Sequence, residues 1–139
     1  MRVMAVDYGD ARTGVAISDA LGMLAGFTTV IHSRKPDQVA QEIGKLVSEH
    51  RVEELVMGFP RNMDGTEGPR AELYRAFAQQ LQEVTGMEVH LWDERRTTIE
   101  AHQILHASGK KMKQHKKNVD AVAATLILEG YLNKLRRSI

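Results

Sequence analysis

The hydrophobic positions at the start of the chain form three short segments with turn-forming residues between them. Residues 2–8, 14–18 and 24–31 are predominantly apolar, and Gly9, Asp19 and Gly22 lie at the breaks. Short apolar runs bounded by Gly and Asp are typical of strands joined by hairpins. We therefore predict that the chain opens with three consecutive strands.

The next apolar positions recur with a helical period. A helix is predicted from Pro36 to about His50, because proline is tolerated at the first helical position and apolar residues follow at the spacing of one helix face. This predicted apolar stripe contains Val39, Ile43, Leu46 and Val47. The continuous apolar run at 55–59 that follows the helix predicts a buried strand.

A second helix is predicted over 69–84, with Pro69 at its start and Gly86 closing it. Its apolar stripe is expected to be Leu73, Phe77 and Leu81, which are spaced by four residues. The remaining segments predict a strand at 87–92 and helices at 97–108 and 118–136. The helix at 97–108 is favoured by a capping box that begins at Thr97 and ends at Glu100.

The predicted order βββαβαβαα indicates an α/β fold with a mixed central sheet and helices on both faces. The 139 residues suit a single domain over 1–139. The chain has no Cys, which excludes disulfides, thiolate metal sites and a cysteine nucleophile. The first apolar run breaks at Asp7, too early for a signal peptide, and no apolar stretch approaches the roughly 20 residues of a membrane span. We expect a cytoplasmic protein without a membrane partner.

The charge is nearly balanced overall, at +1, but it is unevenly distributed. Five lysines crowd one short segment that has no acidic residue from Gly109 to Val119: Lys110, Lys111, Lys113, Lys116 and Lys117. A local basic segment can bind phosphates even when the net charge is close to zero. The alternative, a solvated lysine-rich loop, is equally compatible with this pattern.

Four acidic residues lie where the predicted elements end or begin. Asp7 ends the first strand, Asp93 and Glu94 follow the strand at 87–92, and Asp120 lies in the first turn of the last helix. If the two strands are parallel, their carboxylates meet at one sheet edge, and ligands of open α/β sheets bind at this edge. Clustered carboxylates repel one another unless a cation lies between them, and Mg²⁺ prefers oxygen ligands. Taken singly, each acid also has a structural explanation as a turn, cap or helix-dipole residue.

Four motifs in the chain, taken together, resemble those of the YqgF family, also called RuvX, which is described as a pre-16S ribosomal RNA nuclease or Holliday junction resolvase. The matching segments are 7–9 with 12–16, then 58–67, 93–98 and 119–124, and the resemblance covers nearly the whole chain. It implies an RNase H-like fold related to the RuvC resolvases. It also implies an acidic metal site formed by Asp7, by Asp93 or Glu94, and by Asp120.

Such a site suggests hydrolysis of a phosphodiester bond with two Mg²⁺ ions, for which Mn²⁺ can substitute, and without a covalent intermediate. Because strand residues alternate between faces, only one of Asp93 and Glu94 is expected to face the metal, and the position directly after the strand favours Asp93. Flanking phosphates would be neutralised by the lysine segment and by Arg95, with Arg61 and Arg70 extending the surface.

Two other classes of function remain compatible with the sequence. A phosphotransferase of the sugar kinase and actin type shares the Asp-x-Gly turn, although it needs two such lobes. A non-catalytic nucleic-acid adaptor in transcription or ribosome assembly would use the lysines alone. For a nuclease, the sequence leaves open whether the partner is pre-rRNA or branched DNA, and whether the protein is a monomer or a homodimer.

Overall fold

The computed structural model describes residues 1–22, 25–60, 67–93 and 119–137, with the side chains of 119, 120, 136 and 137 left outside that description. The helix predicted at 97–108 and the lysine segment therefore lie outside the described residues.

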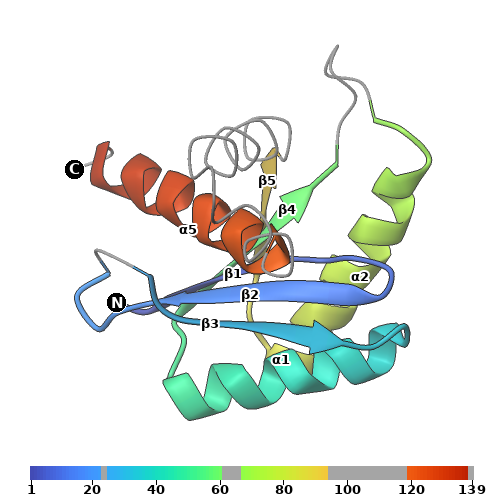
Figure 1. Ribbon diagram of the computed structural model, residues 1–139, viewed down its shortest axis with the longest axis horizontal. Coiled ribbons are helices and arrows are strands. Elements are labelled where there is room, and N and C mark those ends of the chain that lie inside the picture. The colour runs from blue at the N-terminus through green and yellow to red at the C-terminus, as the bar shows by residue number, and fades with distance from the viewer. Residues whose placement is uncertain (23–24, 61–66, 94–118, 138–139) are drawn as a thin grey trace, which may run out of the picture.

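A mixed five-stranded sheet forms the centre of the fold (Figure 1). The strand order is β3-β2-β1-β4-β5, with β1 in the middle. The first three strands pair in antiparallel fashion, whereas β4 is parallel to both β1 and β5. The predicted mixed sheet is thus confirmed, with strands β1 (Val3–Asp7), β2 (Arg12–Ser18), β3 (Ala25–His32), β4 (Glu54–Phe59) and β5 (Val89–Asp93).

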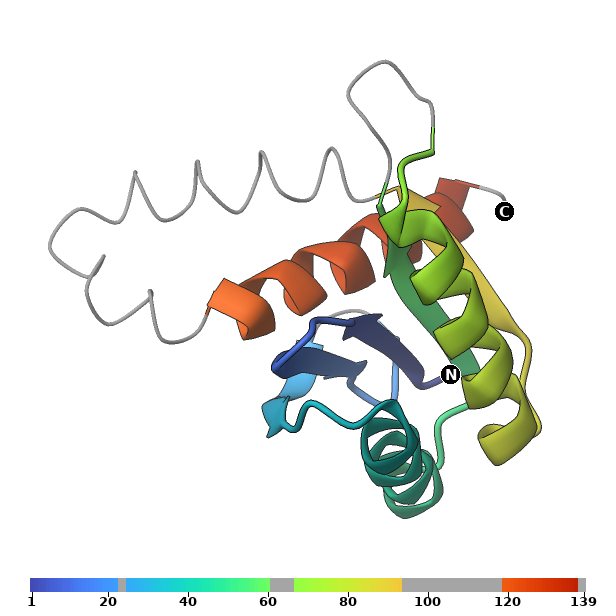
Figure 2. The same ribbon diagram turned by 90° about the vertical axis from the view of Figure 1, so that its right-hand side faces the viewer.

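Helices cover both faces of the sheet, as predicted. Helices α1 (Pro36–His50) and α2 (Arg70–Thr85) pack on one face, and α5 (Val119–Arg137) packs on the other (Figure 2). Two separate hydrophobic cores result from this arrangement. We call the core beneath α1 and α2 the first core and the core beneath α5 the second core.

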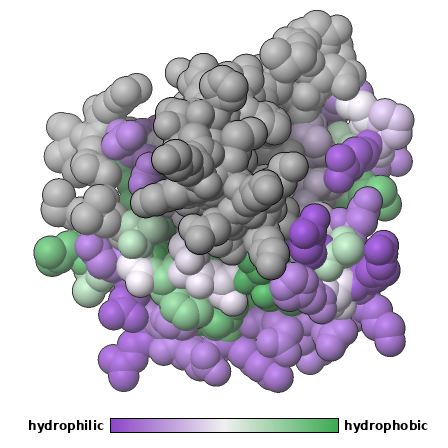
Figure 3. Space-filling view, in the orientation of Figure 1, coloured by the Kyte–Doolittle hydropathy of each residue, from purple (hydrophilic) through white to green (hydrophobic). Residues whose placement is uncertain are grey.

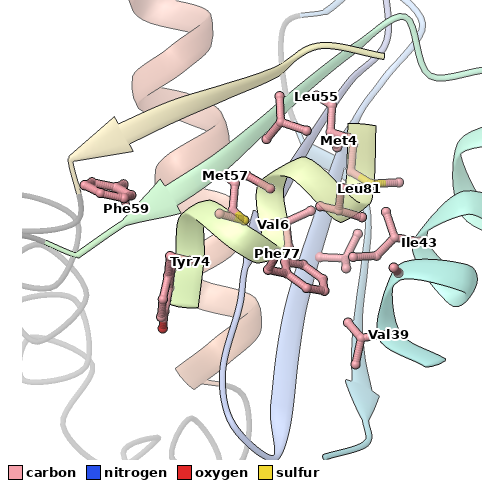
Figure 4. Close-up of a cluster of buried hydrophobic side chains, with 14 of the residues drawn as sticks. Met4, Val6, Val39, Ile43, Leu55, Met57, Phe59, Tyr74, Phe77 and Leu81 are labelled. Carbon is pink, nitrogen blue, oxygen red and sulfur yellow. The ribbon is translucent and has the colours of Figure 1, made fainter. Parts of the chain in front are cut away.

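Strand β1 contributes side chains to both cores. Met4 and Val6 lie in the first core (Figure 4), and Val3 and Ala5 lie in the second. All four residues are fully buried, as expected for a central strand covered on both faces. The alternation along β1 therefore decides which face any residue at the end of this strand will point toward.

Helix α1 matches its prediction closely. Pro36 occupies the start of the helix, and Arg51 ends it in the left-handed conformation with φ of 53°. Val39 and Ile43 are fully buried, and Leu46 and Val47 pack against the same core. Because the apolar stripe and the helix-start signal agree, the sequence alone specifies this element.

The apolar stripe predicted for α2 is correct for Phe77 and Leu81 but wrong for Leu73, which is 64% exposed. The buried residues of this helix are Ala71, Tyr74, Phe77, Ala78 and Leu81. The helix is thus rotated so that Tyr74, rather than Leu73, faces the sheet. This orientation is possible because the Tyr74 hydroxyl is hydrogen-bonded to Arg70 and to the Tyr8 carbonyl.

Hydrophilic residues predominate among the described residues on the face seen in Figure 3. The large apolar side chains that are exposed among the described residues are Met1, Leu21, Phe27, Leu73, Val84 and Leu91. Within the described ranges, no helix is long and apolar enough to cross a bilayer.

Helix α5 passes very close to β5 at Gly130. A Cβ atom at this position would lie 2.8 Å from Cζ2 of Trp92, closer than real contacts allow. The Trp92 indole is itself held edge-on against Tyr131, with ring centroids 6.3 Å apart. A glycine inside a helix is normally unfavourable, so here it is explained by the space that the indole needs.

We predict that Gly130→Ala destabilises the protein. Overpacking costs about 1–3 kcal/mol, and only ~1 kcal/mol of that is offset by the better helix propensity of alanine. The matched control is Gly44→Ala in α1, where the nearest atom is a methyl group of the exposed Val84 at 3.0 Å, which can shift. Urea unfolding should show a lower midpoint for Gly130→Ala and an equal or higher one for Gly44→Ala. Equal effects of the two substitutions would contradict this explanation.

Candidate active site

Asp7 is the last residue of β1 and is partly buried. Val3 and Ala5, four and two positions earlier, lie in the core beneath α5, whereas the ring of the following residue, Tyr8, packs against the first core. Strand alternation therefore directs Asp7 to the face that α5 covers. A carboxylate in this place lies at the carboxyl end of the central strand, where open α/β sheets bind ligands.

The positions next to Asp7 in the sheet are glycines. Asp7 pairs with Gly14 of β2, and the register between β1 and β4, continued by one residue, places Gly58 on its other side. Gly58 in turn pairs with Trp92. Neither neighbouring strand position contributes a side chain beside the carboxylate, so the sheet itself leaves room there for an ion or for a phosphate oxygen.

Helix α5 packs against β1 and β2 on the face to which Asp7 points (Figure 2). Fully buried Ala124 lies at the contact between this helix and the sheet. Asp120 belongs to the first turn of α5, one turn before Ala124, and its side chain is outside the described set. The structure thus brings the helix that carries Asp120 to the face of Asp7, and the role of Asp120 as a ligand stays a prediction.

Strand alternation assigns Asp93 to the other face of the sheet. It pairs with Phe59, which is buried in the first core, and Val89 of the same strand lies in that core too. His90 and Trp92 instead face α5, where their rings contact Tyr131. By this alternation Asp93 and Asp7 belong to opposite faces, and which acid after β5 is a metal ligand stays a prediction. Glu94, the alternative ligand, is outside the described residues.

Of the predicted phosphate-binding residues, the structure describes Arg70. It is the first residue of α2 and is exposed. Its Nη2 donates a hydrogen bond to the Tyr74 hydroxyl at 3.0 Å, and its guanidinium lies 5.4 Å from the centroid of that ring. The other predicted residues lie outside the described ranges: Arg61, Arg95, Lys110, Lys111, Lys113, Lys116 and Lys117.

An aromatic cluster beside Asp7 was missed by the sequence analysis. The Tyr8 ring stacks on Phe77 with a centroid distance of 3.9 Å and meets Tyr74 edge-on at 5.3 Å. The Tyr74 hydroxyl donates a hydrogen bond of 2.6 Å to the Tyr8 carbonyl oxygen. Burial, and secondarily the charge of Asp10, raises the pKa of Tyr8 above its ordinary value. One feature of the sequence could have predicted this cluster: Tyr74 follows Arg70 by four residues and lies on the helix face adjacent to Phe77.

A charged pair fixes the chain where α2 approaches β4. The Arg75 guanidinium binds both carboxylate oxygens of Glu67, at 2.5 and 2.7 Å, and lies 4.8 Å from the centroid of the Phe59 ring. The hydrogen bond to Glu67 raises the pKa of Arg75. The pair is substantially exposed, so its stabilising effect is small.

A second group of titratable residues lies at the opposite end of the parallel strands. Glu54 begins β4, its Oε1 is 3.7 Å from His90 Nε2, and the His90 ring faces Tyr131. Burial, followed by the charge of Glu54 and a hydrogen bond to it, raises the pKa of Tyr131 to about 12. Within the part of the chain that the structure describes, no three His, Asp or Glu side chains are grouped to hold a metal ion.

The sheet and its helices define an α/β protein with an RNase H-like fold, as predicted. A Fowlpox virus resolvase, solved with Holliday junction DNA, has the same fold: the TM-score is 0.58 at 12% identity, over 97% of this chain and 99% of that one. The RuvC protein of Thermus thermophilus, solved with a Holliday junction substrate, gives a TM-score of 0.54 at 12% identity over 91% of each chain.

Sequence relatives are much more similar. Residues 1–134 match the RuvX family, described as "Holliday junction resolvase". A protein of Carboxydothermus hydrogenoformans named "Putative pre-16S rRNA nuclease" is 47% identical over 96% of both chains, and one of Clostridium beijerinckii with the same name is 42% identical over 99% of both. The chain belongs to the RuvX family, which confirms the resemblance found in its motifs and makes it a member of a family of nucleases.

Proposed function

We propose that this protein is a metal-dependent endonuclease that hydrolyses phosphodiester bonds in structured nucleic acid, and that its substrate is the 5′ end of pre-16S rRNA. The observation that carries the proposal is the position of Asp7, at the end of the central strand, between two glycine positions and on the face covered by α5. The names of the relatives support the substrate.

The residues around Asp7 suit a hard divalent cation, because a carboxylate is the preferred ligand of Mg²⁺ and Mn²⁺ and the flanking Gly14 and Gly58 leave it accessible. We propose that Asp7, Asp120 and one acid after β5 hold two such ions. Bound there, the ions supply Lewis-acid activation of water and of the scissile phosphate. The protein's own residues hold the ions, orient the substrate and neutralise its other phosphates.

We infer that the acid after β5 is Glu94, because His90 and Trp92 face α5 and the next position of that alternation is 94. Asp93, in register with buried Phe59, belongs to the opposite face. This choice reverses the preference that proximity to the strand end suggested. Arg70, Arg95 and the five lysines at 110–117 are proposed as contacts to flanking phosphates, with Arg61 extending the surface.

We predict that Asp7→Asn lowers kcat by more than about a hundredfold, since even outer-shell partners of metal ligands change activity or affinity by 10–100-fold. The folded state should be equally stable or more stable without metal, because a partly buried charge is removed. Thermal unfolding in the presence of chelator, together with cleavage rates in Mg²⁺ and Mn²⁺, measures both effects. Wild-type activity in Asp7→Asn, or in chelator, would exclude the proposed site.

The two acids after β5 can be separated by charge-removing substitutions. We predict that Glu94→Gln loses most activity and that Asp93→Asn keeps it within about threefold, since the substituted group lies on the opposite face from Asp7. Each substitution is nearly isosteric, so the two variants control for each other. If Asp93→Asn instead cleaves more slowly than Glu94→Gln, the metal ligand is Asp93.

The substrate is tested by comparing a matched 5′ precursor RNA with a four-way DNA junction, in Mg²⁺ and in Mn²⁺. We predict that the RNA is cleaved and that the junction is cut at least about tenfold more slowly. Preferential cutting of the junction would favour a resolvase, which needs two active sites and hence a homodimer. Binding of both without any cleavage would favour a non-catalytic adaptor and contradict the proposal.

A further inference from the structure

A continuous chain of hydrogen bonds joins an exposed guanidinium to the backbone that follows Asp7. Arg70 Nη2 donates to the Tyr74 hydroxyl at 3.0 Å, and this hydroxyl donates to the Tyr8 carbonyl at 2.6 Å. Tyr8 is the next residue after Asp7. We call this chain of contacts the Arg70–Tyr74–Tyr8 relay.

The aromatic packing restricts movement at the end of the relay. The Tyr8 ring lies nearly parallel to Phe77, at an interplanar angle of 8°, and perpendicular to Tyr74, at 75°. Tyr74 is only 4% exposed and Phe77 only 2%. Because Tyr8 is held both by its ring and by its carbonyl, the backbone at Tyr8 is fixed in place, and this restricts the chain at the neighbouring Asp7.

The outer end of the relay is accessible to a ligand. Arg70 is exposed, and a guanidinium has five N–H donors, of which the relay uses one. The planar arrangement of the remaining donors matches a phosphate. Arg70 lies at the same sheet edge as Asp7, since two hydrogen bonds join it to the residue after Asp7. Arg70 belongs to α2, on the other face of the sheet from the Asp7 side chain, so the proposal requires a nucleic-acid strand that crosses this edge from one face to the other.

We propose that Tyr74 is a positioning residue for Asp7 and that Arg70 binds a backbone phosphate beside the scissile one, so that binding of the substrate strengthens the relay that orients Asp7. This proposal rests on the proposed nuclease function. It adds to that function a coupling between substrate binding and the orientation of the Asp7 carboxylate. The relay transmits this coupling through the Tyr74 hydroxyl group.

The first test is Tyr74→Phe, which keeps the ring and removes the hydroxyl group. We expect kcat to fall about tenfold with KM within twofold, because small misplacements of a catalytic group are costly while substrate contacts are retained. The Mn²⁺ concentration for half-maximal activity should rise severalfold. The control is Tyr131→Phe, which removes another tyrosine hydroxyl at the far end of β5; it should leave kcat and the Mn²⁺ requirement unchanged.

The second test is Arg70→Gln, alone and combined with Tyr74→Phe. Alone it should raise KM by about fivefold and also lower kcat, because phosphate contact and relay are both lost. In the Tyr74→Phe background it should still raise KM but have no further effect on kcat. Additive losses in kcat would mean that the two residues act independently and would overturn the relay.

The failure of the relay is distinguishable from the failure of the proposed function. If the wild type cleaves RNA or junction and Tyr74→Phe matches it in kcat and Mn²⁺ requirement, the relay is wrong and the nuclease function stands. If the wild type cleaves neither, the nuclease function fails. Calorimetry with Mn²⁺ alone then still tests the positioning of Asp7: weaker binding by Tyr74→Phe supports it, and equal binding overturns it.

Discussion

Strand β1 has no exposed face, and the direction of Asp7 depends on this constraint. Its four residues from Val3 to Val6 are fully buried, two in each core. A shift of one residue in the register would exchange the two sets of side chains and place Asp7 in the first core. Burying an ionised carboxylate there without a partner would be strongly unfavourable. The packing of apolar residues on both faces therefore determines the side on which the acid lies.

The two cores are built from residues of different size, and this difference brings α5 close to the site. The first core contains large side chains such as Met4, Met57 and Phe77, whereas the second has Ala5 and Ala16 in the sheet. Alanine at these positions and at Ala124 lets the helix backbone approach β1 and β2 closely. Helix α5 consequently packs on β1, which ends in Asp7, and on its neighbour β2. A sheet with larger residues on this face would hold the helix, and Asp120 with it, farther away.

The elements could be predicted from the sequence wherever local signals agreed with burial. Helix α1 begins and ends where Pro36 and its apolar stripe indicated, and β4 follows its apolar run. The prediction failed at Leu73, because periodicity alone treats Tyr74 as polar and does not see the hydrogen bonds that its buried hydroxyl makes. The hydrogen bond from Tyr74 to the Tyr8 carbonyl joins residues 66 positions apart, so no local pattern could reveal it.

The sequence predicts the candidate site as a set of strand-end and helix-start acids, and of these the structure places Asp7 at the end of the central strand. Choosing between Asp93 and Glu94 needs the face to which β5 directs each residue, and this follows from the pairing of Asp93 with Phe59. The sequence shows neither that pairing nor the two glycines that flank Asp7. Membership of the family supports the assignment to the nucleases. The register of the strands gives the neighbours of Asp7 in the sheet.

The most direct test of this account is a crystal structure of the wild-type protein soaked in Mn²⁺, with the ion located by its anomalous scattering. The account predicts an ion bound to a carboxylate oxygen of Asp7, at about 2.0–2.3 Å, on the face of the sheet that α5 covers, with Glu94 among its ligands. An ion bound by Asp93 on the opposite face, or the absence of any ion at Asp7 at saturating Mn²⁺, would contradict it.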